Sequence, residues 1–246
     1  MKHELSIIIP CYNEDSRGNF TYRIDKLISY MSENTDINVE IILVNDGSDD
    51  NTLPTMKYYE MMYDYVKVVT YRNNVGKSYA IKQGIKRANG DYCLIMNADL
   101  DIPLKNIPKF YNYIKNATLH HLVIGVRKNK YDESFGRRVL SKLAHIDTRL
   151  FLNIKNISDT QCGFKMFRTD KAKQILQYIK SKRWLFDIEL ILYMQALGIK
   201  VRCFEVTAKD DIPTAVITSE IYRSGLKELL MIVSSHRRTI RKIQNN

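Results

Sequence analysis

Residues 91–103, DYCLIMNADLDIP, join a short apolar run to a polar stretch that carries three oxygen-bearing side chains. Asn97, Asp99 and Asp101 occupy alternate positions, and alternate side chains of an extended chain lie on the same side. The three side chains could therefore converge at the end of a strand and hold a metal ion. Asn and Asp are also common in turns, where they bond to nearby backbone. This stretch alone leaves both interpretations open.

The same pattern of an apolar run followed by polar residues occurs elsewhere in the chain. The strand-like runs are LSIIIP at 5–10, VEIILVND at 39–46, VKVVTY at 66–71, DYCLIM at 91–96 and HLVIGV at 121–126. Helix-like stretches lie between them, near 20–33, 51–64, 77–88 and 104–116. This alternation predicts an α/β fold, a Rossmann-like and mostly parallel sheet with helices on both faces. In such sheets ligands bind beyond the carboxyl ends of the strands.

The length and the charge of the chain limit the classes of protein to which it can belong. A chain of 246 residues suits one large α/β domain, although two small domains remain open. The net charge of +11 favours anionic partners such as nucleotides, nucleic acid or an acidic membrane surface. The four cysteines form no C-x-x-C pair, so we expect no structural zinc. Reduced thiols and the lack of a secretory leader predict a cytoplasmic protein.

Polar residues after the first strand are candidates for nucleotide contacts. In IPCYNE, Pro10 fixes the direction in which the strand ends, and Tyr12, Asn13 and Glu14 follow at the predicted crevice. These three side chains could bond to a base or a ribose. A tight structural turn would use the same residues.

The second and third strand ends add further candidates. Capping and turn chemistry explain most of NDGSDDNT, and Asp46 is left over as a ribose or base ligand. Gly76 permits close backbone approach, and Lys77 opens a helix whose N-terminus could bind phosphate. Neither G-x-G-x-x-G nor G-x-x-x-x-G-K-[ST] is present, so a dinucleotide fold and a P-loop are not supported.

The ordered motifs IIIPCYNE, ILVNDGSDDNT, NVGKSYAIKQG and ANGDYCLIMNADLDIP resemble the nucleotide-sugar half of inverting family 2 glycosyltransferases, which have the GT-A fold. DTQCGFKMF at 159–167 and RWLFDIELI at 183–191 resemble the polyprenyl-phosphate branch, above all dolichyl-phosphate β-glucosyltransferases. The resemblance implies a GT-A domain over 1–217. Its nucleotide-sugar half would cover about 1–130 and its acceptor half about 131–217.

The resemblance also implies a divalent cation, Mg²⁺ or Mn²⁺. In the family the fourth strand usually ends Asp-Ala-Asp, and the carboxylates meet a metal that carries the nucleotide diphosphate. Here the motif reads Asn97, Ala98 and Asp99. We expect Asp99 to be the main ligand, Asp101 to bind directly or through water, and Asn97 to act as a hydrogen-bonding group. Mg²⁺ needs only one or two carboxylates besides phosphates and water.

The implied reaction moves a hexose, with glucose favoured, from a UDP-sugar to a polyprenyl phosphate. A lipid phosphate is already ionised and needs cations rather than a strong base. We expect Arg127 to act at the catalytic centre and Arg137 and Arg138 to bind the acceptor. Gln161, Lys165 and Trp184 are further acceptor-side candidates.

Two alternatives remain open. A soluble family 2 enzyme with a sugar hydroxyl as acceptor would need a carboxylate base, for which Asp159, Asp187 and Glu189 are candidates. Asp187 could equally cap a helix. A nucleotide-sugar or nucleic-acid binding protein without catalysis would also fit the net charge. No recognised nucleic-acid motif is present, so we expect no nucleic-acid partner.

Two stretches, 134–154 and 218–246, have apolar residues at helical spacing and many basic residues between them. Each would pack its apolar side on the core. Two basic amphipathic helices in a cationic chain also suit peripheral contact with a membrane.

Overall fold

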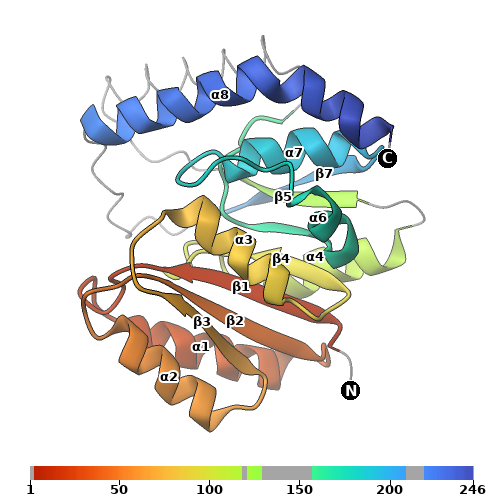
Figure 1. The fold of residues 1–246 in the computed structure, drawn as a ribbon. Helices are drawn as coiled ribbons and strands as arrows, with labels where there is room; N and C mark the ends of the chain where they lie inside the picture. The colour runs from red at the N-terminus through yellow and green to blue at the C-terminus, as the bar shows by residue number, and fades with distance from the viewer. Residues whose placement is uncertain (1–2, 118–120, 129–156, 209–218, 246) are drawn as a thin grey trace.

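The computed structural model describes residues 3–117, 121–128, 157–208 and 219–245, with the backbone alone for 219–222. The described residues form a seven-stranded sheet in the order β3-β2-β1-β4-β6-β5-β7 (Figure 1). The strands are β1 Leu5–Cys11, β2 Val39–Asp46, β3 Val66–Tyr71, β4 Tyr92–Ile95, β5 His121–Arg127, β6 Lys165–Arg168 and β7 Lys200–Val206. All neighbouring pairs are parallel except those of β6, which runs antiparallel to β4 and β5.

Helices cover both faces of the sheet, as predicted. One hydrophobic core joins the sheet to α1 Phe20–Asn34, α2 Thr52–Met62 and α4 Asn106–Asn116. The other core joins it to α3 Lys77–Arg87, α6 Thr169–Ile175 and α7 Phe186–Ala196. Side chains of β1 alternate between them, with Ile7 in the first core and Ile8 in the second.

The helix α8, Ser219–Gln244, lies outside α7 as an additional layer (Figure 1). Its Ile232 and Ile243 are buried in the second core. The predicted C-terminal amphipathic helix is thereby confirmed, whereas the stretch 134–154 lies outside the described residues. No helix among the described residues is long and apolar enough to cross a bilayer.

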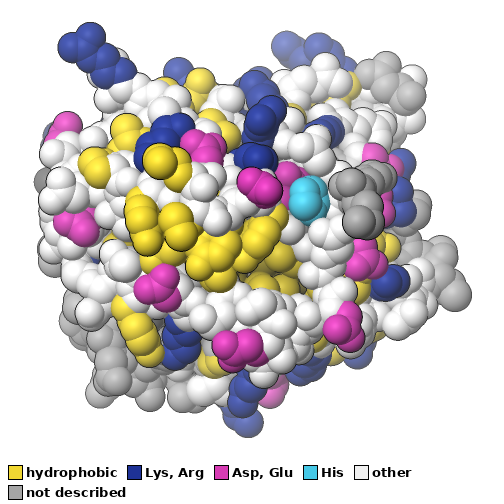
Figure 2. All heavy atoms as spheres, turned by 90° about the horizontal axis from the view of Figure 1, so that it is seen from below, with side chains coloured by type: hydrophobic (Ala, Val, Ile, Leu, Met, Phe, Trp, Pro, Cys, Tyr) yellow, Lys and Arg dark blue, Asp and Glu magenta, His cyan; other side chains and the backbone are white. Residues whose placement is uncertain are grey.

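The predicted strands and helices of the first half are confirmed, and β6 is an addition. It has only four residues, and its pairing with β4 and β5 depends on contacts distant in sequence. On the face seen from below, hydrophobic side chains gather near the middle of the view (Figure 2). The exposed large hydrophobic side chains of α1 and α2 include Tyr22, Tyr58 and Met61.

Candidate functional site

The loops after β1 and β2 are tied together by hydrogen bonds. The backbone N–H of Asn13 donates to Ser48 Oγ at 3.0 Å, and the N–H of Asp49 donates to Asn13 Oδ1 at 2.9 Å. Asn13 has a φ of 51°, a left-handed conformation that asparagine tolerates better than most residues. The Asn13 side chain therefore joins the loop after β1 to the loop after β2, next to the half-buried Tyr12.

Glu14 is a buried carboxylate in the loop after β1. Its Oε1 accepts a hydrogen bond from Arg17 Nη1 at 2.8 Å. Its Oε2 makes no hydrogen bond with the described residues, and Arg23 Nη1 lies 3.8 Å from it. Burial raises the pKa of Glu14, Arg17 opposes that rise, and the negative charge of Asp99 adds to it. Glu14 therefore keeps one acceptor oxygen available close to the acids after β4.

Asp46, at the end of β2, organises the loop after β3. Its carboxylate accepts hydrogen bonds from Tyr71 Oη at 2.7 Å, Asn74 Nδ2 at 3.0 Å, and the backbone N–H groups of Val75 and Gly76 at 2.9 Å each. Asp46 is almost completely buried. These four donors already surround both oxygens of the carboxylate. The expected contact of Asp46 with a ribose or a base stays a prediction.

The N-terminus of α3 is closed by protein rather than left open for phosphate. Ser78 N donates to Arg183 O at 3.2 Å, and Tyr79 N donates to Lys182 O at 2.9 Å. Gly76 has a φ of 117°, and a Cβ added there would lie 2.8 Å from Arg183 Cα. Loop carbonyls already accept from these two N–H groups, so the expected phosphate contact at Gly76 and Lys77 stays a prediction that these groups do not support. The close approach at Gly76 is to the Arg183 backbone.

The Lys77 side chain instead reaches the turn after β4. Its Nζ donates to Asn97 Oδ1 at 2.7 Å, and Asn97 Nδ2 donates to Asp101 Oδ1 at 3.3 Å. Asn97 therefore forms hydrogen bonds within the protein, and its expected role beside the donor stays a prediction. Since the lysine uses the amide oxygen, the carboxylates of Asp99 and Asp101 remain as the candidate metal ligands of this turn.

Asn97, Asp99 and Asp101 meet through a turn and not through an extended strand. Leu100 N donates to Asn97 O at 3.2 Å, and Asp101 N donates to Asp99 Oδ1 at 3.1 Å. Leu100 has a φ of 51°, which is strained for a leucine. Ala98 is buried beneath the turn. The two open interpretations of this stretch are thus compatible: a turn brings the oxygen-bearing groups together.

The two carboxylates fit a hard divalent cation. Burial and the charge of Asp99 raise the pKa of Asp101, whereas Lys77 and Arg127 oppose that rise. A bound cation would offset the same repulsion. The described residues contain no cluster of three or more His, Cys, Asp or Glu that could hold a metal. A cation here would therefore need oxygens from a diphosphate and water in addition to the protein.

Arg127, at the end of β5, is held by a buried acid. Its Nε and Nη2 donate to Asp159 Oδ2 and Oδ1 at 2.7 and 3.1 Å. Burial alone would raise the pKa of Asp159, but hydrogen bonds and charge from Arg127 outweigh it and lower that pKa. Nη1 of Arg127 stays outside this bidentate pair and can serve an anion. Asp159 is consequently a poor candidate for a general base.

Lys165 and Asp187 form an ion pair in the interior. Lys165 is fully buried, and its Nζ lies 2.6 Å from Asp187 Oδ1 and donates to Cys162 O at 2.5 Å. The ammonium of Lys165 is thus held by Asp187 and Cys162 O, and its expected place on the acceptor side stays a prediction. Asp187 is not a helix cap, since α7 begins at Phe186 with Leu185 as the capping residue.

The remaining acceptor-side candidates differ in exposure. Glu189 is fully buried and accepts hydrogen bonds from Lys180 N, Ser181 N and Tyr193 Oη, so it holds the loop before α7. Gln161 is exposed, and Trp184 is 38% exposed. Arg137 and Arg138 lie outside the described residues.

The loop at 159–165 packs directly on the turn after β4. A Cβ added at Gly163 would overlap the amide group of Asn97. The glycine therefore brings the motif expected to bind the acceptor against the motif expected to bind the metal.

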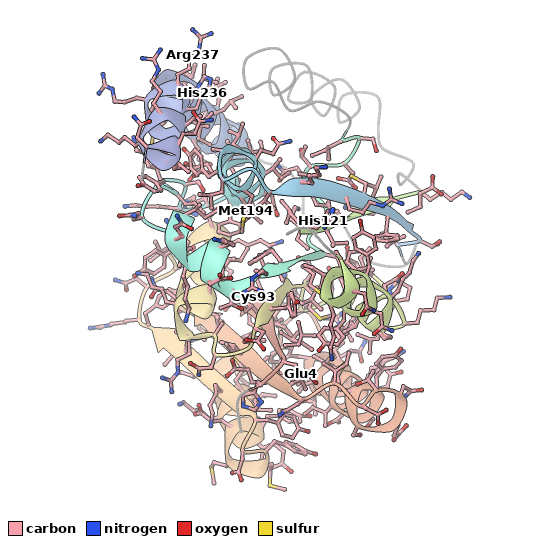
Figure 3. The ribbon with its side chains drawn as sticks, turned by 90° about the vertical axis from the view of Figure 1, so that its right-hand side faces the viewer. Glu4, Cys93, His121, Met194, His236 and Arg237 are labelled. Carbon is pink, nitrogen blue, oxygen red and sulfur yellow. The ribbon has the colours of Figure 1, made fainter. Side chains whose placement is uncertain are left out.

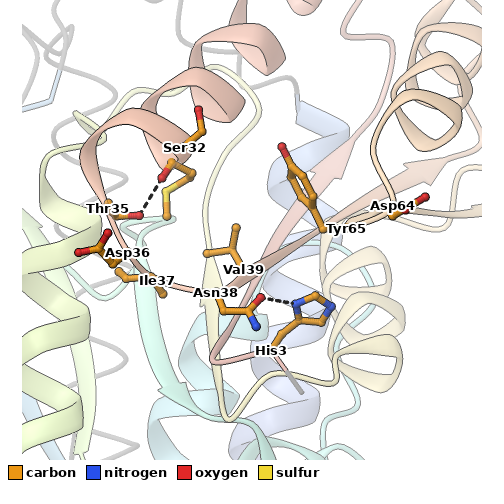
Figure 4. A pocket seen from close by; sticks show the side chains of 10 residues that line it. His3, Ser32, Thr35, Asp36, Ile37, Asn38, Val39, Asp64 and Tyr65 are labelled. Carbon is orange, nitrogen blue, oxygen red and sulfur yellow. Dashed lines mark hydrogen bonds between the residues drawn. The ribbon is translucent and has the colours of Figure 1, made fainter. Parts of the chain in front are cut away.

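A pocket at the opposite edge of the sheet does not join this site (Figure 4). It is lined by His3, Val39 and Tyr65, which lie at or before the starts of β1, β2 and β3. In Figure 4 the His3 ring bonds to Asn38 Oδ1, at 3.0 Å. The polar motifs gather at the carboxyl ends of the strands, so we place the candidate site there.

One residue that fixes the site region was not indicated by the sequence. Glu228, on α8, accepts hydrogen bonds from the backbone N–H groups of Lys182, Arg183, Trp184 and Leu185 at 2.8 to 3.3 Å. It thereby fixes the loop that closes α3. No local pattern marks such a residue, because its partners lie more than 40 positions away.

Known proteins share this sequence pattern and this fold. The profile of the family described as glycosyl transferase family 2 matches residues 6–176. A dolichyl-phosphate beta-glucosyltransferase of Dictyostelium discoideum is 31% identical over 211 residues, which cover 80% of this chain and 64% of that protein. A dolichyl-phosphate beta-glucosyltransferase of Homo sapiens is 30% identical over 217 residues, which cover 80% of this chain and 65% of that protein. The chain thus spans just under two thirds of these relatives.

Solved structures support the fold. Glucosyl-3-phosphoglycerate synthase from Mycobacterium tuberculosis, in complex with UDP, superposes with a TM-score of 0.67 at 16% identity, covering 94% of this chain and 80% of that chain. The same synthase with Mn²⁺, UDP-glucose and phosphoglyceric acid gives a TM-score of 0.62 at 16% identity, covering 99% and 80%. The expected GT-A fold is confirmed.

Proposed function

The chain belongs to glycosyl transferase family 2, and from this premise we propose that it moves a hexose, glucose by preference, from a UDP-sugar to a polyprenyl phosphate of the dolichyl type. The donor would occupy the crevice formed by the nucleotide-sugar half, about 1–130. The acceptor would enter from the side of the acceptor half, about 131–217. The names of the relatives support the acceptor class, and the solved structures with UDP support the donor class.

The observation that carries the proposal is the state of the three candidate bases. Asp159 is paired with Arg127, Asp187 with Lys165, and Glu189 accepts buried hydrogen bonds. A hydroxyl acceptor needs a carboxylate that can take its proton. A phosphate is ionised at neutral pH and needs only cations, so the arrangement favours a phosphate acceptor.

The chain's own residues supply charge and orientation at the reacting centre. Asp99 and Asp101 would hold a divalent cation, which when bound offsets charge on the leaving diphosphate. Lys77, positioned by Asn97, adds a second positive charge on that side. Arg127, positioned by Asp159, presents Nη1 to the attacking phosphate. The acceptor oxygen attacks the anomeric carbon as the bond to the diphosphate breaks, which inverts that centre.

The test is transfer of sugar to short polyprenyl phosphates. The protein is incubated with UDP-glucose, GDP-mannose and Mg²⁺ or Mn²⁺, and products are identified by mass. A hexosyl polyprenyl phosphate formed from UDP-glucose supports the proposal. Products formed with sugar hydroxyls alone would support the alternative acceptor class. Absence of both products and of UDP binding in calorimetry would contradict the proposal.

A further inference from the structure

We propose that the outward side of α8, together with Trp184, is a docking surface for bilayers that contain anionic lipids. The inference rests on the exposure, charge and anchoring of described residues. It does not depend on the proposed reaction, since the surface can be assayed without donor or acceptor.

Burial fixes which side of α8 faces outward. Ile232, His236, Thr239 and Ile243 are buried, and they repeat at spacings of three and four on one side of the helix. Residues on the other side are exposed along the same helix. In Figure 3, Arg237 lies on α8 at the outer edge of the molecule.

The outward side carries positive charge that the helix does not neutralise. The stretch 223–245 contains six Lys and Arg and one acidic residue, Glu228. The Glu228 carboxylate is turned to the four backbone N–H groups of 182–185. Arg237, Arg238, Arg241 and Lys242 line one shallow hollow of the surface. These cations are therefore available to anions outside the protein.

Leu226 and Leu230 lie on this outward side, nearer the start of the helix, and Trp184 lies beside α8 at the loop 182–185. Leu226 is 41% exposed, Leu230 is 60% exposed and Trp184 is 38% exposed. Trp184 Nε1 donates to Ser224 Oγ at 3.2 Å, which holds the indole beside α8. Exposed leucines and a tryptophan next to clustered Arg and Lys are typical of helices that lie in a bilayer interface. A purely polyanionic partner would have no use for the leucines.

The docking surface is rigidly joined to the candidate donor site. Glu228 fixes the loop 182–185, and carbonyls of that loop accept from Ser78 and Tyr79 at the start of α3. Lys77 lies one residue before Ser78. A bilayer bound to α8 would therefore be held at a fixed position relative to Lys77.

The test is vesicle flotation with the full chain, using phosphatidylcholine alone and phosphatidylcholine with phosphatidylserine. The variant replaces Arg237, Arg238, Arg241 and Lys242 by Gln. The matched control replaces four exposed lysines on other elements by Gln, namely Lys26, Lys105, Lys109 and Lys200. We expect the α8 variant to lose affinity for anionic vesicles on the order of 100-fold, and the control less than about threefold. Leu230→Ser should weaken binding at unchanged charge.

Three outcomes would overturn the proposal. The first is equal flotation with neutral and anionic vesicles, and the second is an equal loss in the control variant. The third is RNA binding as tight as vesicle binding with no effect of Leu230→Ser, which would indicate a general polyanion surface. Circular dichroism checks that each variant is folded. UDP binding without vesicles should be unchanged in both variants, so failure of docking leaves the proposed reaction untouched.

Discussion

Replacing Asp187 by Asn should strongly destabilise the protein, because Lys165 would keep a buried charge without its counter-ion. Lys165 is fully buried, with Nζ 2.6 Å from Asp187 Oδ1. After the change, Lys165 Nζ would be left with neutral acceptors, Cys162 O and the amide oxygen of Asn, in place of a carboxylate. Loss of one partner of a buried ion pair costs about 3–5 kcal/mol. For a chain of this size that corresponds to a fall in Tm of roughly 10 °C.

Urea unfolding followed by circular dichroism measures the free energy of unfolding. The matched control is Asp170→Asn, which removes the partner of Arg168 in an exposed ion pair of 2.9 Å. That change should cost less than about 1 kcal/mol. The double variant Lys165→Met with Asp187→Leu removes both charges and should recover most of the loss. Equal costs for Asp187→Asn and the control, or no recovery in the double variant, would contradict the buried-pair interpretation.

Three further changes test the site. Gly76→Ala should lower the urea midpoint and weaken UDP binding in calorimetry, because its Cβ would overlap the Arg183 backbone at a φ of 117°; unchanged stability would contradict this. Asn97→Asp should raise the affinity for Mn²⁺ in the presence of UDP about tenfold, because it adds a carboxylate beside Asp99. It should weaken the binding of UDP without metal, since Lys77 would then pair with that carboxylate. Equal affinities of the variant and the unchanged protein in both titrations would contradict this. The lowered pKa of Asp159 means that its stabilisation is present above the ordinary Asp value near 3.9 and is lost as pH falls through the lowered one. Urea midpoints from about pH 5 to pH 2 should show this acid loss. The loss should be smaller in Asp159→Asn, where the lowered pKa values of groups such as Glu4 and Asp50 still contribute.

The strands of the first half could be predicted because hydrophobic periodicity is local. Runs such as LSIIIP and VEIILVND are buried on both faces of the sheet, so most of their residues are apolar. β6 could not be predicted from local hydrophobic periodicity. Its four residues, KMFR, form a strand because β4 and β5 pair with them on either side.

The site shows the same division between local and distant causes. The turn at 97–101 is made by hydrogen bonds between residues two or three positions apart, so the local sequence was enough to indicate it. The occupation of the α3 N-terminus was not predictable, because its partners, the carbonyls of Lys182 and Arg183, come from more than 100 residues away. The burial of Lys165 likewise depends on Asp187, which comes from α7 and not from the neighbouring helix α6.

The most direct test of the site is calorimetric titration of UDP with and without Mn²⁺, for the unchanged protein and for Asp99→Asn. If Asp99 and Asp101 hold a cation that binds the diphosphate, Mn²⁺ should raise UDP affinity at least about tenfold in the unchanged protein and have little effect in the variant. UDP affinity that responds equally to Mn²⁺ in both proteins, or in neither, would contradict a cation site at the end of β4.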